Sequence, residues 1–376
     1  MRAWLLGVGL LGGCFTEFID PPTGPACAPN CRDDALVALD SGGRASCAVG
    51  LRGELFCWGR AGSTALGPGV ESAETPALVD SGPGWNDVRT SPGFQGHTCG
   101  IREGGELFCW GSNLEQQLGN CGAGTSAEFF RVNDQQWRSV DVGLNFTCAI
   151  RQDRSLWCWG LSGAGQFGID TNQQCPPVPV APASDWDQVR LGRAHACAIR
   201  GPDALWCWGI GSEGQTGFGP TEATEPRQLP DFRVRVVATG TDHTCAIDRG
   251  GALHCWGANV AGQLGHSEAP GPARVGDRND WVSVAAGLGH SCGVIADGTL
   301  FCWGDNSEGQ LGRGARGSGP LEIAPVLGDQ DYQFVTAGDS VTCATKTDGS
   351  LWCWGLGDRD GSPGGTTTIP TALALP

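Results

Sequence analysis

The cysteines are the residues whose type and spacing point most directly to chemistry. Seven pairs are separated by ten positions, and the second member of each pair stands directly before a Trp-Gly dipeptide. Thiols at such a spacing can form disulfides or bind a metal. Structural zinc usually draws on cysteines separated by two to four residues and gathered four at a time, which this spacing does not supply. We therefore predict seven disulfides: Cys47–Cys57, Cys99–Cys109, Cys148–Cys158, Cys197–Cys207, Cys245–Cys255, Cys292–Cys302 and Cys343–Cys353.

The other cysteines complete the count of 19. Cys121 and Cys175 follow the second and third of these Trp-Gly dipeptides, so we predict a bridge Cys121–Cys175 between neighbouring units. Cys27 and Cys31 can form a further bridge, Cys27–Cys31, which leaves Cys14 for lipidation. So many cysteines indicate an oxidising compartment rather than a reducing cytosol.

One serine matches a catalytic motif. Gly289 to Gly293 reads G-x-S-x-G, the pattern around the nucleophile of many hydrolases, with Ser291 at its centre. Five of the other cysteine pairs carry Ser or Thr at the same place, directly before the first Cys. A nucleophile would not need such equivalents, so we interpret Ser291 as structural and predict no catalytic residue.

Four histidines share one register, two positions before a paired cysteine: His97, His195, His243 and His290. A ring of four imidazoles could bind a metal, but we expect each one to bond local backbone within its own unit. Asp358 to Gly361 resembles half of a calcium loop and lacks the downstream Glu. We therefore predict no metal and no cofactor.

The cysteine pairs also mark an internal repeat that must position these side chains. From Trp58 to Trp354 the unit recurs seven times, at a mean period of roughly 49 residues. A turn such as Asp297-Gly298 lies between the paired cysteines and predicts a β-hairpin with the two cysteines opposite each other. A third strand precedes the hairpin, and a weaker fourth strand, usually starting at Pro, lies further upstream. Four short strands per repeat predict an all-β, seven-bladed β-propeller with four-stranded blades.

The two ends of the repeat array predict how the ring closes. The first copy begins at Leu36 without a fourth strand of its own upstream, and the chain ends with an additional strand from Pro370 to Leu375. We predict that this C-terminal strand joins the first blade and closes the ring, which leaves no unpaired sheet end at the seam. The propeller would then span residues 36–376.

The repeat resembles the regulator of chromosome condensation repeat. Residues Gly287 to Gly312 match its motif most fully, with G-x-x-H-[ST]-C followed by D-G-x-L-[FW]-C-W-G and G-Q-L-G. The resemblance covers residues 36–376 and implies a seven-bladed propeller. It also implies varied binding roles, among them nucleotide exchange on a small GTPase, chromatin docking and, in a secreted bacterial member, inhibition of β-lactamases. It implies no shared active site.

The N-terminus predicts export from the cytosol. Residues 1–13 combine Arg2 with a short apolar run and small residues, as in a signal peptide. Cys14 follows directly and resembles the acylated cysteine of a bacterial lipoprotein. Residues 14–35 are rich in Pro, Gly and acidic side chains and predict a lipidated tether. We expect the protein to be secreted or lipid-anchored in the bacterial cell envelope.

The net charge and the loops that interrupt the repeat indicate which partners the protein can bind. The formal net charge of −16 makes nucleic acid a poor partner, because Lys and Arg carry phosphate binding. Loops that break the repeat are the candidate binding elements, and their spare aromatic residues are Phe94, Phe129 and Phe130. We predict a monomeric, non-catalytic scaffold, with only its lipid in the membrane, for a protein or surface glycan partner. The alternatives are an envelope carbohydrate-active enzyme and a guanine-nucleotide exchange factor.

Overall fold

The computed structural model describes residues 35–60, 64–70, 73–82, 84–94, 96–122, 124–171, 175–181, 184–267, 271–317, 322–328, 330–357, 361 and 365–376. The signal peptide predicted at 1–13, the lipidated Cys14, the Cys27–Cys31 bridge and the tether up to residue 34 lie outside the described residues. The acidic turn at 358–360 lies outside them too. In the described part of the chain, no helix has the length and hydropathy that crossing a bilayer requires.

The strands form seven four-stranded units, which we number as blades in chain order. Blades one to three contain β1 Leu36–Ser41, β2 Ala45–Gly50, β3 Leu55–Gly59, β4 Ala73–Asp80, β5 Trp85–Thr90, β6 His97–Arg102, β7 Leu107–Gly111, β8 Ser126–Arg131, β9 Trp137–Val142, β10 Phe146–Arg151, β11 Leu156–Gly160 and β12 Val178–Pro179. Blades four and five contain β13 Trp186–Leu191, β14 His195–Arg200, β15 Ala204–Gly209, β16 Ala223–Thr239, β17 His243–Asp248, β18 Leu253–Gly257 and β19 Ala273–Arg274. Blades six and seven contain β20 Trp281–Ala286, β21 His290–Ile295, β22 Leu300–Gly304, β23 Ala324–Pro325, β24 Tyr332–Ala337, β25 Val341–Lys346, β26 Leu351–Gly355 and β27 Thr367–Leu373.

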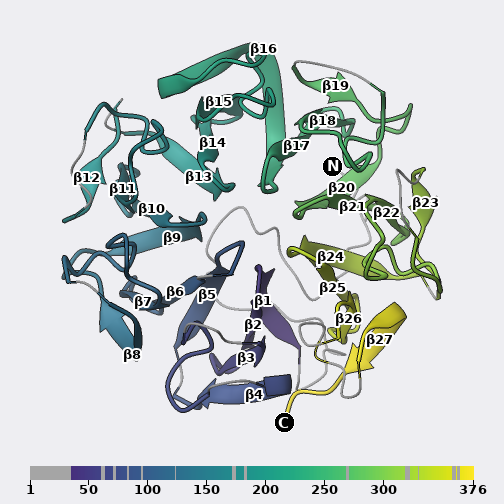
Figure 1. The fold of residues 1–376 in the computed structure, drawn as a ribbon, viewed down its shortest axis with the longest axis horizontal. Coiled ribbons are helices and arrows are strands. Elements are labelled where there is room, and N and C mark those ends of the chain that lie inside the picture. Colours follow the sequence, from purple (N-terminus) through teal and green to yellow (C-terminus); the bar gives the residue numbers. More distant parts are fainter. Residues whose placement is uncertain are drawn as a thin grey trace, which may run out of the picture.

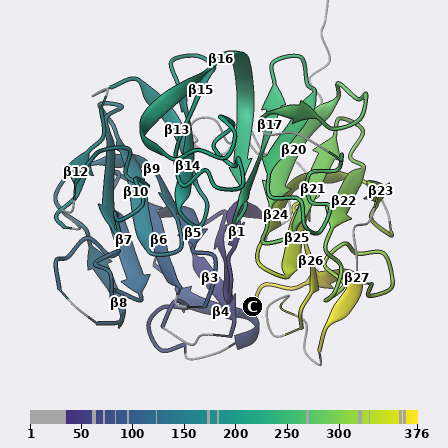
Figure 2. The same ribbon diagram turned by 45° about the horizontal axis from the view of Figure 1, so that its top comes forward.

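The blades form a ring around a central axis. Figure 1 shows the first strand of each blade nearest the axis and the fourth strand at the rim. Figure 2 shows the same blades from an oblique direction, packed side by side around that axis. The prediction of a seven-bladed propeller with four-stranded blades is confirmed.

Each blade is built on the predicted hairpin. In blade six, Asp297 accepts hydrogen bonds from the backbone N–H of Thr299 at 2.9 Å and from its hydroxyl at 2.7 Å. Gly298 follows with a φ of +86°, which a residue with a Cβ rarely adopts. This turn sets the register of β21 and β22, in which Cys292 stands opposite Cys302. The side chains of the two cysteines therefore meet across the hairpin.

The strand β16 is longer than the repeat predicts. Its 17 residues pair first with β15 in blade four and then, from Val234 onward, with β17 in blade five. One continuous strand therefore serves as the rim strand of one blade and the axial strand of the next. The two blades form a single seven-stranded sheet, whereas the other five blades are separate four-stranded sheets.

The predicted closure by the C-terminal strand was wrong. β27 pairs with β26, so it completes blade seven, and blade one has its own fourth strand in β4. The Pro-containing strands pair with the strand before them in the chain, so a blade is one contiguous segment and not a composite of two repeats.

Side-chain packing and loop contacts close the ring instead. Blades one and seven share a hydrophobic cluster that includes Trp58 and Val341, with Leu375 packed against it. The Asp339 N–H donates to the Gly42 oxygen at 3.3 Å across the seam. Figures 1 and 2 both place the C-terminus between β27 and β4, which is where this packing occurs.

The hydrophobic core lies between blades as well as within them. One cluster joins Cys292 and Val294 of blade six to Trp354 of blade seven, and the remaining clusters follow the same pattern around the ring. The Trp of every Cys-Trp-Gly sequence is fully buried: Trp58, Trp110, Trp159, Trp208, Trp256, Trp303 and Trp354. A single repeat therefore cannot bury its own hydrophobic surface.

We predict that removing one hairpin disulfide destabilises the ring without changing its fold. In the chain-entropy account, a bond that closes an 11-residue loop contributes about 3 kcal/mol to the free energy of unfolding. The double variant Cys292→Ala/Cys302→Ala should lose at least about that amount in urea unfolding under non-reducing conditions. By the same account, Cys121→Ala/Cys175→Ala, which opens a longer loop, should lose about 4 kcal/mol. Parent-like unfolding of both double variants would contradict this account of the disulfides.

Candidate functional site in the central channel

Disulfides occupy the thiols of all sixteen described cysteines. Each hairpin pair is bonded, with Cα atoms 4.1 Å apart: Cys47–Cys57, Cys99–Cys109, Cys148–Cys158, Cys197–Cys207, Cys245–Cys255, Cys292–Cys302 and Cys343–Cys353. The Cys121–Cys175 bond joins loops of blades two and three, with a Cα separation of 5.2 Å. These sulfur atoms are therefore not available as metal ligands. Among the described residues, no group of three or more His, Cys, Asp or Glu side chains is placed to hold a metal ion.

The four histidines that stand two positions before a paired cysteine form hydrogen bonds between blades. His290 Nε2 lies 2.9 Å from the Thr342 hydroxyl of the next blade, and that hydroxyl donates onward to the Gln310 carbonyl at 2.8 Å. Because the hydroxyl has only one hydrogen, the imidazole must be the donor. The same arrangement recurs for His97 with Thr147, His195 with Thr244 and His243 with Ser291. The expectation that each imidazole bonds backbone within its own blade was wrong.

This arrangement assigns Ser291 a structural role. Its hydroxyl accepts from His243 of the preceding blade and donates to the Gln263 carbonyl at 2.8 Å. A serine nucleophile needs a general base to take its proton, but here the imidazole is the donor of the hydrogen bond. The hydroxyl therefore forms a contact between blades, which gives the structural role predicted for Ser291 a partner that the sequence analysis did not foresee.

Burial keeps these imidazoles neutral. It lowers the pKa of His97, His195 and His243 to about 3 and that of His290 to about 4. Their Nδ1 atoms are buried and have no hydrogen-bond partner in the described structure. A second proton on such a ring would have no acceptor, so protonation opposes the folded state.

Charged side chains line the axial strands of the first four blades. The fifth residue of these strands is Asp40, Arg89, Asp141 and Arg190 in turn, an alternation of acid and base that we name the charged row. The equivalent residues of blades five to seven are small: Ala238, Ala285 and Thr336. The large side chains on one side and the small ones on the other surround a cavity of about 330 Å³.

Both acids of the charged row bond to the next blade. The Asp40 carboxylate accepts from the Thr90 N–H at 2.7 Å and from its hydroxyl at 3.1 Å. Asp141 accepts from the Leu191 N–H at 2.6 Å. Burial raises the pKa of Asp141 to about 6, although Arg190 and Arg89 attract its ionised form. These two carboxylates hold neighbouring axial strands together.

The two arginines of the charged row have fewer fixed partners. Arg89 pairs with Asp87 at 3.2 Å, and its buried Nε has no hydrogen-bond partner in the described structure. Arg190 donates from Nη1 to the Val189 oxygen of its own strand at 2.9 Å. Burial lowers the pKa of Arg190, and repulsion from Arg89 adds to the decrease. Asp141, Asp87 and Asp40 oppose that decrease, and the same three acids raise the pKa of Arg89.

The cavity reaches the loops that connect the first and second strands of the blades. Its lining includes Pro92, Thr241 and Gly287, which lie in three of these loops. Backbone bonds link neighbouring loops, such as Thr241 N–H to the Gly287 oxygen at 3.1 Å. We name the surface formed by the described residues of the loops 42–44, 91–94, 96, 143–145, 192–194, 240–242, 287–289 and 338–340 the loop face.

Phe94 is the predicted aromatic residue that stands on the loop face. It is 62% exposed, and the Arg44 guanidinium lies over its ring at 4.7 Å. Leu288 on the loop of blade six is also exposed. A large exposed ring held by a neighbouring cation on a rigid scaffold can serve as an anchor for a partner.

The predicted loop position of the other two aromatic residues was wrong. Phe129 and Phe130 belong to strand β8. Phe129 packs edge-on against Trp110 and Trp85, with ring centroids 4.9 and 5.2 Å away. Side chains of a strand alternate between its two faces, so this ring is directed into the core between blades and not toward a partner. Phe130 lies opposite Cys109 in the sheet and is half-buried.

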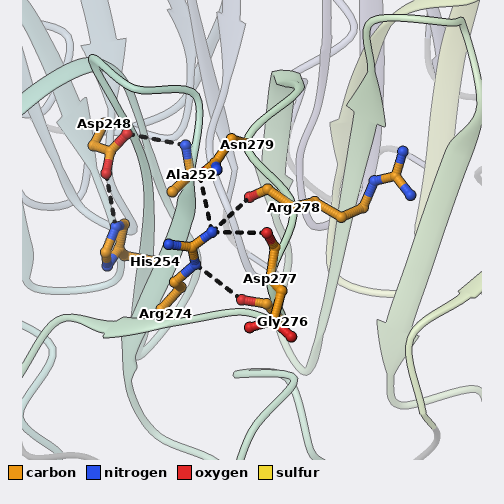
Figure 3. A network of polar contacts seen from close by, with 8 residues as sticks. All are labelled: Asp248, Ala252, His254, Arg274, Gly276, Asp277, Arg278 and Asn279. Carbon is orange, nitrogen blue, oxygen red and sulfur yellow. Dashed lines mark hydrogen bonds and ion pairs between the residues drawn. The ribbon is translucent and has the colours of Figure 1, made fainter.

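A polar network fixes the connection between blades five and six. The Arg274 guanidinium donates to the backbone oxygens of Gly276, Asp277 and Arg278 and to the Asn279 side chain, as Figure 3 shows. One guanidinium therefore holds the loop that leads from β19 to β20. The arrangement is structural, because its donors are directed to the protein's own backbone.

His254, in the same region, stands where the other repeats carry an aromatic residue before Cys-Trp-Gly. It lies 3.0 Å from the Asp248 carboxylate and packs edge-on against Phe232 (Figure 3 shows the histidine and the acid). Burial of Asp248 would raise its pKa, but the Ala252 N–H and His254 hold it below the usual value. His254 therefore keeps a ring contact at this position and adds a hydrogen bond to Asp248.

The charged row is the functional candidate that the sequence analysis did not single out. Its signal was present, since the fifth residue after the start of each axial strand alternates between Asp and Arg in four successive repeats. The pattern becomes visible only when one position is read across all repeats. Within a single repeat, each of these residues looks like an ordinary polar residue on a half-exposed strand.

Comparison with known proteins supports the repeat assignment. Two family models described as regulator of chromosome condensation (RCC1) repeat match this chain. One matches residues 94–117, 137–166, 234–263 and 281–310, and the other matches residues 203–247 and 297–345. No curated protein sequence matches the chain significantly.

Solved structures of RCC1-type propellers are similar in fold. Prp20p from Saccharomyces cerevisiae has a TM-score of 0.74 and 20% sequence identity, over 91% of this chain and 88% of the yeast chain. Human WBSCR16 has a TM-score of 0.76 and 18% identity, over 86% of this chain and 94% of the human chain. At such identities the similarity establishes the arrangement of the blades and no shared site.

We predict that acid destabilises the protein through its buried histidines. The folded pKa of His243 lies far below the ordinary value near 6.5, so the unfolded chain binds the proton first as the pH falls. The stability is present above pH ~6.5 and is lost toward pH ~3, by about 1.4 kcal/mol per pH unit for each such histidine. Tryptophan fluorescence during urea unfolding at several pH values measures this slope.

The variant His243→Gln isolates one of these groups. Its amide can donate to Ser291 but does not titrate, so its free energy of unfolding should fall less steeply between pH 6 and 4, by about 1.4 kcal/mol per pH unit. Arg131→Gln, an exposed change on the rim strand β8 that removes an ion pair with Glu106, should keep the parent slope. Parallel curves for the parent and His243→Gln would contradict the assignment.

Proposed function

Because this chain belongs to the regulator of chromosome condensation (RCC1) repeat family, we propose that it is a non-catalytic scaffold that binds a protein partner on its loop face. The observation that carries the proposal is the position of Phe94. This ring is 62% exposed on a loop inserted into a ring of rigid blades, with Arg44 against it. Aromatic and arginine side chains are the residues that most often dominate binding energy at protein interfaces.

The related structures support binding as the class of function. The yeast propeller Prp20p is described by its binding to Gsp1p and histones, and it has also been solved with Kap60 bound. Those partners belong to the yeast protein. For this chain we propose only that a protein docks on the ring, at a surface that its own loops define.

We also propose that the protein works outside the cytosol, anchored in a bacterial envelope. Eight disulfides in the described part of the chain favour an oxidising compartment. The signal-like residues 1–13 and the position of Cys14 supply the anchor in this proposal. A guanine-nucleotide exchange role fits the family but would require the cytosol, where such disulfides do not persist.

A carbohydrate-active enzyme is the second candidate, because Asp40 and Asp141 line the channel and Asp87 lies close to its arginines. Hydrolysis of a glycosidic bond needs two carboxyl groups that flank the substrate. Asp40 and Asp141 instead accept backbone N–H groups, and Asp87 pairs with Arg89. Their partners favour a structural and electrostatic role over acid–base catalysis.

Intact-mass measurement of the native protein tests the proposed compartment. We expect a chain that starts at Cys14, carries a diacyl or triacyl group there and has its other 18 cysteines oxidised. Alkylation before and after reduction counts the free thiols. Free thiols in most blades would overturn the extracytosolic location, and an unmodified chain that retains residues 1–13 would overturn the anchor.

Site-specific photocrosslinking tests the loop face. A benzoylphenylalanine in place of Phe94 should crosslink to one protein in the native envelope, whereas the same probe at Ile369, half exposed on the rim strand β27, should not. With that partner purified, Phe94→Ala should weaken binding at least tenfold and Ile369→Ala should leave it unchanged. Equal crosslinking at both positions would refute the proposal. Crosslinking of the Phe94 probe to glycans and to no protein would refute it too.

A further inference from the structure

The central cavity has two unlike walls. The charged row, Asp40, Arg89, Asp141 and Arg190, forms one side, and the axial strands of blades five to seven form the other. That second wall is mainly apolar and includes Val236, Ala238, Val282 and Ala285. A volume of about 330 Å³ lies within the range of small-molecule pockets, which runs from roughly 300 to 1,000 Å³.

We infer that this cavity is a binding site for a small organic carboxylate. The guanidinium groups of Arg89 and Arg190 would hold the carboxylate, and the apolar body would rest against blades five to seven. This ligand site goes beyond the proposed docking of a protein on the loop face, because Arg89 and Arg190 lie on axial strands inside the ring and Phe94 does not line the cavity.

The acids of the cavity are already engaged by protein donors. Asp40 accepts from the N–H and hydroxyl of Thr90, and Asp141 accepts from the Leu191 N–H. Asp339, the third acid of the lining, accepts from the Gly93 N–H at 3.4 Å, and Asp87, beside the cavity, is paired with Arg89. A carboxylate whose oxygens accept hydrogen bonds repels a second anion less than a bare one, since its charge is partly neutralised by the donors.

The arginines, in contrast, retain donor capacity. A guanidinium has five N–H donors in a planar fork, which matches a carboxylate with two parallel bonds. Arg89 uses part of its fork on Asp87 and leaves Nε without a partner, and Arg190 donates to the Val189 oxygen. A third guanidinium of the lining, that of Arg235, donates to the Trp281 oxygen and is directed away from the row.

Repulsion between the two guanidinium groups favours an anion between them. Repulsion from Arg89 adds to the burial that lowers the pKa of Arg190, although Asp141, Asp87 and Asp40 oppose the decrease. A bound carboxylate would attract both groups and relieve that repulsion. The Gln188 side-chain oxygen also lines the cavity and has no hydrogen-bond partner in the described structure, so it can accept from a donor on the ligand.

The apolar wall selects the rest of the ligand. Ala238 and Ala285 occupy the positions at which the first four blades carry long charged side chains, and this difference in size leaves the space. An inorganic anion would leave the apolar wall without contact. A planar ring or branched carbon chain bearing one carboxylate would contact both walls at once.

Three probes of the same shape but different charge test the inference. Benzoate, benzamide and benzamidine are titrated by calorimetry against the full chain with its disulfides intact, at equal ionic strength and pH 7. We expect benzoate to bind at least tenfold more tightly than benzamide, and benzamidine to bind no more tightly than benzamide. Benzamidine equal to or stronger than benzoate, or no heat from benzoate up to its solubility limit, would overturn the inference.

Two variants locate the binding within the cavity. Arg190→Gln should weaken benzoate at least tenfold, while Arg193→Gln, three residues later on the loop face and paired with Asp242, should leave it unchanged. Ala238→Leu keeps every charge of the cavity but fills its space, so it should abolish benzoate binding. This variant tests the site independently if Arg190→Gln does not fold. Parent-like affinity in Ala238→Leu would overturn the site. Phe94→Ala should leave benzoate binding intact, which separates this site from the loop face.

Discussion

The ring depends on backbone carbonyl groups in several loops, each of which accepts two hydrogen bonds from the blade that follows. In blade six, the Gln263 oxygen of the preceding blade accepts the Trp303 indole at 2.9 Å and the Ser291 hydroxyl at 2.8 Å. The equivalent oxygens of Ala65, Gln117, Gln215 and Gln310 accept the same two donors from the blade that follows each of them. Because these donors are fully buried, losing an acceptor would leave polar groups without partners, so each blade requires its neighbour.

This dependence explains how much of the fold could be predicted from the sequence. The ten-residue spacing of Cys292 and Cys302 and the turn at Asp297-Gly298 predict the hairpin, because both are local. Whether a Pro-containing strand joins the repeat before it or the one after it is not local. Both choices give the same spacing, and only the pairing of β4 with β3 and of β27 with β26 distinguishes them.

The candidate site was predicted less well than the fold, for a physical reason. An interruption of the repeat predicts an exposed aromatic residue only if that residue stays in a loop. Phe94 does so and is exposed, whereas Phe129 lies in strand β8 and packs against Trp110. The charged row is not visible along the chain, because Asp40 and Arg89 lie 49 positions apart and become neighbours only when blades one and two pack side by side. The charged row can be found by comparing the same position in successive repeats, but not from a motif within one repeat.

Strand alternation explains how a regular ring can hold an irregular cavity. The fourth residue of each axial strand is buried and aliphatic: Leu39, Val88, Val140, Val189, Val237, Val284 and Val335. The fifth residue points to the opposite face, toward the channel, where it varies from Asp to Arg to Ala around the ring. The framework therefore constrains one position while the adjacent position stays variable. The cavity owes its charged and apolar walls to that difference, and the same logic lets a seven-fold scaffold carry a site with no symmetry of its own.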